Sequence, residues 1–139
     1  QEELMELLAK LLKDIRREYL PRQILAEKEQ TTEQRILCYI QEHFTEQSFS
    51  LGKLADEFHL SQSYLTRLIK QETGSSFSEL LTNLRIDMAI SFLMEKPDMK
   101  LVEIADKTGF ASQHYFSRVF KEKTGFPPAD YRQYRRQME

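Results

Sequence analysis

The chain contains an internal sequence repeat with a spacing of about 50 residues, and this repeat constrains the fold more than any other feature. The run Leu54–Asp56 returns as Ile104–Asp106, 50 residues on. The run Ser61–Arg67 returns as Ser112–Arg118, 51 residues on, so the second copy holds one extra residue between its two halves. Two copies are too few for a solenoid or a propeller. We therefore expect a small structural unit that is used twice.

The interior of each copy predicts a turn between two helices. In the second copy Gly109 stands four residues after Ala105, where a glycine can adopt the left-handed conformation that ends a helix. In the first copy His59 holds the equivalent place. Histidine is one of the non-glycine residues enriched at positive φ, so we expect the same turn there.

Residues that favour helix ends bracket the second half of each copy. Ser61 and Ser112 stand where an N-cap is needed, and a serine hydroxyl can accept a hydrogen bond from the first turn of a helix. Gly74 and Gly125 stand where the same two helices should end. The unit described by these residues is a compact helix–turn–helix.

The two second helices each predict one apolar face and one polar face. The apolar residues recur at helical spacing and are Leu65, Leu68 and Ile69 in one copy, Phe116, Val119 and Phe120 in the other. The opposite faces carry amides, hydroxyls and cations, with no carboxylate before Glu72 and Glu122. These are the groups that read base edges in DNA. An ordinary solvated helix face is the alternative, and the repetition of the pattern argues against it.

Particular residues follow as candidates for DNA contact. We expect base reading by helices near 62–73 and 113–124, through Gln62, Ser63, Thr66, Arg67, Gln113, His114, Ser117 and Arg118. Phosphate contacts are expected from Lys70, Lys121, Lys123, Arg132 and Arg135. For Arg67 and Arg118 a phosphate contact remains as open as a contact with guanine.

The second copy and its continuation carry a recognisable motif. It comprises Gly109-Phe110, Ser112, the run Tyr115–Lys121, the run Thr124–Pro128 and Tyr131-Arg132. On these residues the chain, over roughly 33 to 135, resembles the DNA-binding domain of the AraC/XylS family of bacterial transcription regulators; Pro127 departs from the family's usual Ser or Thr. The resemblance implies an all-helical domain of two helix–turn–helix subdomains that read adjacent major-groove segments of double-stranded DNA. It also implies RNA polymerase as a partner and an effector-sensing or signal-receiving domain upstream.

The expected fold class is all-α, with two homeodomain-like helix–turn–helix subdomains joined by a long connector helix and preceded by a helical extension. Thr31 with Gln34 and Ser76 with Glu79 have the spacing of capping boxes. We expect subdomains at 31–76 and 97–139 and a connector at 77–96 that stops before Pro97. Arg85 lies on the connector, where a structural salt bridge is favoured over a phosphate contact.

The first 30 residues predict a helix of a different kind. Leu4, Leu8, Leu11 and Ile15 step by 4, 3 and 4 residues, which is a heptad seam, and Pro21 interrupts or restarts the helix. Residues 1–30 are interpreted as a linker helix from a larger regulator or as a short coiled coil. The coiled coil would give a weak homodimer through residues 1–20. Because residue 1 is Gln, we expect the chain to be part of a longer protein.

Charge and composition exclude several other functions. The net charge is −2; residues 1–50 carry 7 Lys and Arg against 10 Asp and Glu, and residues 51–139 carry 13 against 12. DNA affinity should therefore depend on local placement of cations, and a helical adaptor that binds protein is the competing function.

Cys38 and the three scattered histidines have no metal-ligand spacing. We expect no enzyme activity, catalytic residue, cofactor, metal or membrane span, and a cytoplasmic location.

Overall fold

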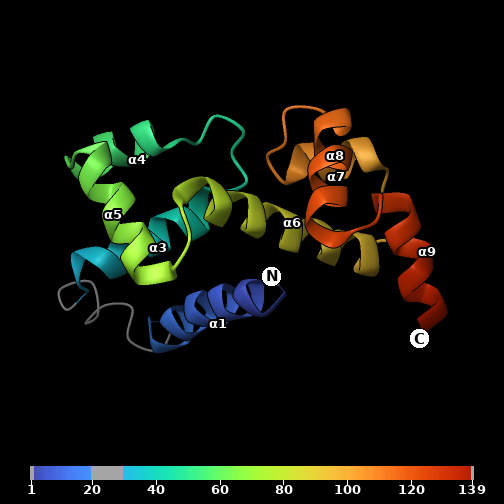
Figure 1. The fold of residues 1–139 in the computed structure, drawn as a ribbon, viewed down its shortest axis with the longest axis horizontal. Helices are drawn as coiled ribbons and strands as arrows, with labels where there is room; N and C mark the ends of the chain where they lie inside the picture. The colour runs from blue at the N-terminus through green and yellow to red at the C-terminus, as the bar shows by residue number, and fades with distance from the viewer. Residues whose placement is uncertain (1, 20–29, 139) are drawn as a thin grey trace. The chain divides into compact units, whose positions relative to one another are not determined.

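The computed structural model describes residues 2–19 and 30–138, and every regular element in this part of the chain is an α-helix (Figure 1). The expected all-α fold is thereby confirmed. The helices are α1 (Glu2–Tyr19), α3 (Thr32–His43), α4 (Leu51–Phe58), α5 (Gln62–Thr73), α6 (Phe77–Glu95), α7 (Leu101–Lys107), α8 (Gln113–Thr124) and α9 (Pro128–Met138).

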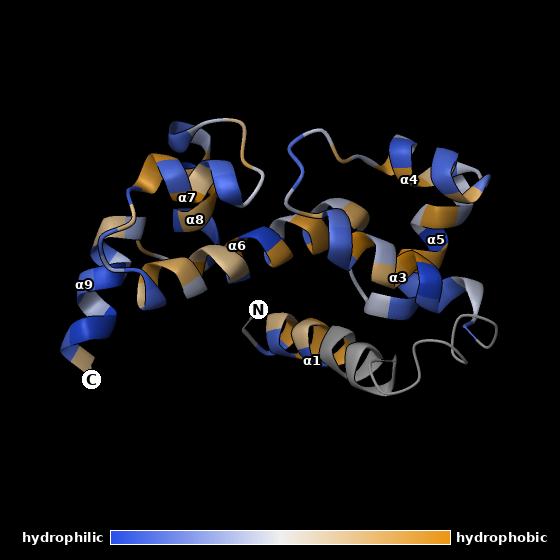
Figure 2. Cartoon of the chain, turned by 180° about the vertical axis from the view of Figure 1, so that it is seen from behind, coloured by the Kyte–Doolittle hydropathy of each residue, from blue (hydrophilic) through white to orange (hydrophobic). Residues whose placement is uncertain are grey.

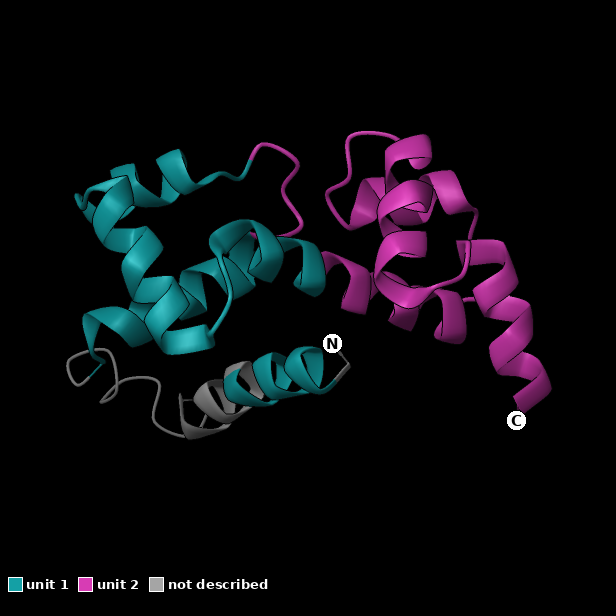
Figure 3. Ribbon diagram, viewed as in Figure 1, with its two compact units in different colours: residues 1–43, 49–84 teal, residues 44–48, 85–139 magenta. Residues whose placement is uncertain are grey.

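The chain divides into two compact units (Figure 3). Unit 1 comprises residues 1–43 and 49–84, and unit 2 comprises residues 44–48 and 85–139. The repeated segments therefore lie one in each unit, with α4 and α5 in unit 1 and α7 and α8 in unit 2. Helix α6 contributes its first half to unit 1 and its second half to unit 2.

The core of unit 1 is built from the apolar faces of α3, α4, α5 and the start of α6. Ile40, Leu54 and Leu65 are completely buried. An aromatic cluster extends this core, with the Phe49 ring 5.6 Å from the Phe77 ring. The capping box at the start of α3 forms in both directions, since the Thr31 and Gln34 side chains each accept a hydrogen bond from the other's backbone N–H.

The core of unit 2 depends on phenylalanine where unit 1 uses leucine and isoleucine. Phe116 and Phe120 of α8 are completely buried, and Phe110 is 4% exposed. The Phe116 ring lies 5.2 Å from Phe110 and 5.6 Å from Phe120, and Tyr131 of α9 adds an edge-on contact with Phe120. Tilted aromatic contacts of this kind stabilise a core beyond the area that they bury.

Helix α6 carries hydrophobic residues along much of its length (Figure 2). Its main apolar stripe is largely buried and comprises Phe77, Leu80, Leu81, Leu84, Met88, Ala89, Phe92 and Leu93. Asn83 and Ile86 are also buried, although they lie off that stripe. The cause is that α6 packs in two cores, so a single amphipathic face does not describe it.

Both interhelical turns form as expected, and their hydrogen bonds locate the extra residue of the second copy. His59 has φ 55° and Gly109 has φ 93°. The N–H of Leu60 donates to Ala55 O, and the N–H of Phe110 donates to Ala105 O, both at 3.0 Å. These bonds are equivalent at a spacing of 50 residues, so the inserted residue is Ala111.

Helix α1 lies in unit 1 and packs with α3 (Figure 1). Leu8 is 3% exposed, Leu4 and Leu11 are half-buried, and Leu7 is 68% exposed. Part of the heptad seam is thus covered within the same chain. The expected seam residue Ile15 and the expected interruption at Pro21 lie outside the residues whose side chains or placement the structure describes.

Two smaller expectations are adjusted by the structure. Cys38, whose place beside Leu37 and Ile40 at helical spacing favours a buried position, is half-buried. Arg85 has a structural role as expected, but the hydrogen bonds that show it go to the backbone carbonyls of Phe44 and Glu46 and not to a carboxylate. In the described part of the chain, none of the helices has the length and apolarity that crossing a membrane requires.

Candidate nucleic-acid interface

The two second helices, α5 and α8, begin and end in the same way. The Ser61 and Ser112 hydroxyls each accept a hydrogen bond from the backbone N–H three residues later, at 3.1 Å in both helices. Gly74 and Gly125 end the helices in the left-handed conformation, with φ of 77° and 88°. The caps predicted from the sequence are confirmed. The serine caps are local side-chain-to-backbone bonds and the glycine ends are local backbone conformations, which is why two residue types at fixed spacing sufficed to predict them.

The apolar and polar faces of α5 and α8 are also as expected. The six predicted apolar residues are buried. The opposite side is open to solvent at Gln62, Ser63, Thr66, Arg67, Gln113, His114 and Arg118, while Ser117 is half-buried. The structure therefore brings the candidates of each copy onto one face of one helix. Their contact with DNA stays a prediction.

The hydroxyl proton of Thr66 is already used in a hydrogen bond within α5. It donates to the Gln62 carbonyl at 2.8 Å. Since its only proton is used, Thr66 can offer a DNA base only its oxygen lone pairs and its methyl group. A contact with an amino group of adenine or cytosine, or with the thymine methyl, fits these groups.

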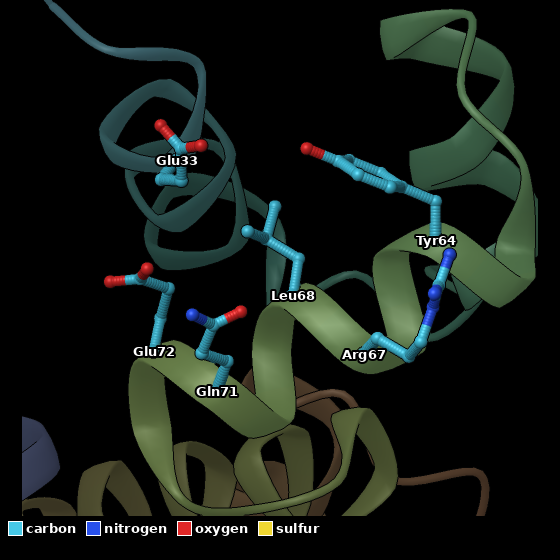
Figure 4. Close-up of a pocket in the computed structure, with 6 residues that line it drawn as sticks. All are labelled: Glu33, Tyr64, Arg67, Leu68, Gln71 and Glu72. Carbon is cyan, nitrogen blue, oxygen red and sulfur yellow. The ribbon is translucent and has the colours of Figure 1, made fainter.

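Arg67 lines a hollow of about 310 Å³ in unit 1 (Figure 4). Glu33 comes from the first turn of α3, and Tyr64, Leu68, Gln71 and Glu72 come from α5. In Figure 4 the Arg67 side chain runs toward the Tyr64 end of the hollow, away from Glu72. The face around Arg67 therefore combines one guanidinium with two carboxylates.

Arg118, the equivalent residue of α8, has a different environment. Its guanidinium lies 5.3 Å from the centre of the Tyr115 ring, in a cation–π contact. Lys123 occupies the position that is equivalent to Glu72 at the repeat spacing of 51 residues. The exposed face of α8 is consequently more positive than that of α5.

Four of the five phosphate candidates are placed where an anion could reach them. Lys70, Lys121 and Arg135 are exposed, and Lys123 is half-buried. The Lys70 ammonium donates to the Gly74 carbonyl at 3.0 Å, which stabilises the end of α5 and leaves two N–H groups free for an anion. Arg135 lies 5.9 Å from the centre of the Tyr131 ring.

Arg132 differs from the other phosphate candidates, because its guanidinium is bound inside unit 2. Its Nε donates to Leu93 O at 3.2 Å, and its Nη2 donates to Lys96 O at 3.3 Å and to Met99 O at 3.1 Å. These carbonyls lie at and just after the end of α6, where backbone acceptors lack helical partners. The half-buried guanidinium satisfies them, so we assign Arg132 a structural role in place of a phosphate contact.

Sequence reasoning missed two features of this surface. Tyr64 and Tyr115 are exposed aromatic residues three positions before Arg67 and Arg118, and their repetition at 51 residues was the available signal. Glu33 reaches the same surface from a helix about 30 residues earlier in the chain, which no local pattern could show. Within residues 2–19 and 30–138 no cluster of histidine, cysteine and carboxylate groups could hold a metal ion.

Comparison with known sequences agrees with this geometry. Residues 54–134 match the family model described as "Helix-turn-helix domain". The arabinose operon regulatory protein of Escherichia coli (strain K12) is 34% identical over 94 residues, which are 68% of this chain and 32% of that protein. The HTH-type transcriptional regulator YtdP of Bacillus subtilis (strain 168) is 36% identical over 102 residues, which are 73% of this chain and 13% of that protein. The chain thus spans a third or less of these two relatives.

Comparison with solved structures gives the same result for the fold. The C-terminal domain of AraT, a response regulator from Geobacillus stearothermophilus, has a TM-score of 0.70 at 40% identity, covering 73% of this chain and 83% of that domain. The DNA-binding domain of the global transcriptional factor AdpA, solved in complex with a target DNA, has a TM-score of 0.72 at 25% identity. That match covers 79% of this chain and 97% of the AdpA domain.

Proposed function

The chain belongs to the AraC/XylS family of helix–turn–helix transcription regulators, and we propose that it binds double-stranded DNA with sequence preference through α5 and α8. Each helix would enter the major groove with its serine-capped N-terminal end toward the bases. Two successive segments on one face of the duplex, about 34 Å apart, would then be read by one chain.

The observation that carries this proposal is the matched pair of exposed helix faces. Gln62 and Gln113 stand at the first helical position after the serine caps, and Arg67 and Arg118 stand five positions further on. Each face combines amide, hydroxyl and guanidinium groups, which can discriminate bases in the major groove. A protein-binding adaptor would not require two such faces of the same design.

The candidate residues would divide into those that contact DNA bases and those that contact phosphates. We assign base reading to the first turns of the two helices and to Thr66, Ser117 and the two arginines. Lys70, Lys121, Lys123 and Arg135 would hold phosphates, because lysine and arginine contacts to the backbone supply the salt-dependent part of affinity. Arg67 and Arg118 retain both options, since a guanidinium can pair with guanine or with phosphate in a bidentate manner.

The decisive experiment selects bound duplexes from a random pool and then footprints the best sequence. The proposal predicts two protected segments centred about 10 bp apart for each bound chain. A titration of the same duplex with salt should show affinity that falls steeply as salt rises. If the chain binds no duplex, or binds with no salt dependence, the adaptor function replaces the proposed one.

Three further partners and properties follow as proposals. A DNA partner would place the chain in the bacterial cytoplasm, and family membership supports the proposal of RNA polymerase as a further partner. The homodimer through residues 1–20 would use the stripe that α1 partly buries against unit 1, where Leu8 is 3% exposed. Dimerisation would therefore require α1 to leave α3, and sedimentation at rising concentration, compared with a chain starting at Thr31, tests it.

A further inference from the structure

Arg85 holds a segment of the chain that is far from it in sequence. Its Nε donates to Phe44 O at 2.7 Å and its Nη2 donates to Glu46 O at 2.9 Å. Both carbonyls belong to residues 44–48, the link between α3 and α4, which clusters with unit 2. The planar fork of a guanidinium suits two acceptors in fixed positions, and the shorter bond has the length expected when the donor is charged.

The turn between α7 and α8 packs against the same place. A Cβ added to Gly109 would lie 2.8 Å from Thr45 O and 2.9 Å from Arg85 Nε. Both distances are too short for a side chain, so the backbone of the turn rests directly on the segment that Arg85 holds. Gly109 is needed here for close approach as well as for its φ of 93°.

The packed turn is followed in the chain by the N-terminal end of α8, which carries candidate base-reading residues. Three residues after Gly109, the Ser112 cap sets the start of the helix that carries Gln113 and His114. Burial lowers the pKa of Arg85, and an electrostatic interaction with Tyr115, on the first turn of α8, acts in the opposite direction. Tyr115 also contacts Phe110 of the turn, with ring centres 6.0 Å apart.

We infer that Arg85 is a positioning residue for the reading of DNA by α8. It acts without touching DNA, by holding residues 44–48 as the support on which the Gly109 turn rests. The turn in turn sets the direction in which Gln113 and His114 leave the domain. This inference rests on the proposed DNA-binding function and adds a residue that lies outside both reading helices.

Arg132 provides an internal contrast for this inference. It also donates Nη2 to a carbonyl after a helix end, Lys96 O, which is equivalent to Glu46 O at the repeat spacing of 50 residues. The two arginines thus bind equivalent loops. Only Arg85 has the α7–α8 turn packed on its side chain and loop. Comparison of Arg85 with Arg132 therefore distinguishes the stabilisation of a loop from the positioning of a reading helix.

The test measures preference at each DNA segment separately. The selected duplex is compared with duplexes in which one segment is scrambled, and Gln113→Ala identifies the segment read by α8. For Arg85→Gln we expect the preference at that segment to fall by about tenfold, the size of one lost base contact. The preference at the other segment should change by less than about twofold. The control Lys100→Gln removes one exposed positive charge from unit 2 and should leave both preferences unchanged.

Binding is measured well below the unfolding midpoint of each variant, so that a loss of folded protein does not contribute to the measured preference. Arg85→Lys keeps the charge and the aliphatic stem, but one ammonium cannot reproduce the fork, so we expect an intermediate loss. It also decides the question if Arg85→Gln does not fold. In ¹H–¹⁵N spectra of Arg85→Lys, amides from Gly109 to Tyr115 should shift, whereas those from Ser61 to Thr66 should not.

Two results would overturn the inference. One is a folded Arg85→Gln, or Arg85→Lys if the former is unfolded, that keeps the wild-type preference at the α8 segment. The other is an equal loss at both segments, which would mark Arg85 as important only for general stability. Failure of the proposed function looks different, because the wild-type chain itself would then show no preference at either segment.

Discussion

The two helix–turn–helix turns share a positive φ and equivalent backbone hydrogen bonds, but their surroundings differ. His59 is exposed, and its side chain extends into solvent. Gly109 is buried, and a Cβ there would clash with Thr45 O and the Arg85 side chain. A left-handed residue can therefore carry a side chain in the first copy, because the turn is open to solvent there. In the other copy packing, in addition to φ, demands glycine.

The reading faces differ as well. Arg67 shares its hollow with Glu33 and Glu72, whereas Arg118 lies over Tyr115 with Lys123 at the position equivalent to Glu72. Carboxylates near a reading helix weaken its attraction for phosphate, and the effect is screened by salt. The duplicated units are therefore not equivalent in charge, and unit 2 should supply more of the salt-dependent affinity.

The largest expected effect separates the two turns. Gly109→Ala should destabilise the protein by about 2–4 kcal/mol, because it adds left-handed strain and overpacking against a backbone carbonyl. His59→Gly should change the free energy of unfolding by less than about 1 kcal/mol, since nothing packs on that side chain and glycine suits the turn. Urea unfolding of both variants measures the contrast, and equal costs would show that the packing at Gly109 is unimportant.

The next prediction separates structural cations from phosphate-binding cations in unit 2. Arg132→Gln leaves helix-end carbonyls without their charged partner and should cost about 1.5–3 kcal/mol of stability. Its salt slope for DNA binding should stay at the wild-type value. Lys121→Gln should do the reverse, with stability nearly unchanged and the slope lower by about 1. A slope that falls in Arg132→Gln would restore the phosphate contact expected from the sequence.

A third prediction concerns the two arginines of the reading faces. If Arg67 or Arg118 reads a base, its replacement by alanine should cost about 1–3 kcal/mol on the selected duplex and relax preference at one position. If it holds a phosphate, all sequences should weaken alike and the salt slope should fall by about 1. Binding titrations on selected and random duplexes distinguish the two roles. Unchanged binding of the double variant to both duplexes would contradict either role.

The smallest effect tests the difference in charge between the faces. Glu72→Gln should raise affinity for any duplex by about two- to fivefold at low salt, and the gain should shrink as salt rises. Lys123→Gln should lower affinity by a similar factor. Glu122→Gln removes a carboxylate from α8 instead of α5, and it should give a similar salt-dependent gain because the effect is electrostatic. Affinity in Glu72→Gln that does not depend on salt would argue against the electrostatic explanation.

The features that the sequence predicted well are those produced by neighbours along the chain. The Ser61 and Ser112 caps, the Gly74 and Gly125 helix ends and the buried face at Leu65 all formed as expected. These bonds and periodicities span at most one or two helical turns. Even the left-handed histidine at position 59 was indicated by its place in the repeat.

The features that were missed depend on residues that are distant in sequence. Arg132 looked like an exposed cation on a basic final helix, and its three acceptors lie 33 to 39 residues earlier. Glu33 reaches the surface beside Arg67 from a different helix. Ile86 is buried although it lies off the main apolar stripe of α6, because this helix enters two cores.

Two helix–turn–helix units, the caps that begin and end their reading helices, and the polar face of each helix follow from the amino-acid sequence. Hydrogen bonds between near neighbours and a 3.6-residue period are sufficient to specify these features. Which cations remain free for DNA, and why one turn requires glycine while the other carries histidine, depend on the packing of remote segments. Those answers depend on which carbonyls and side chains from remote segments come within contact distance, which local pattern does not encode.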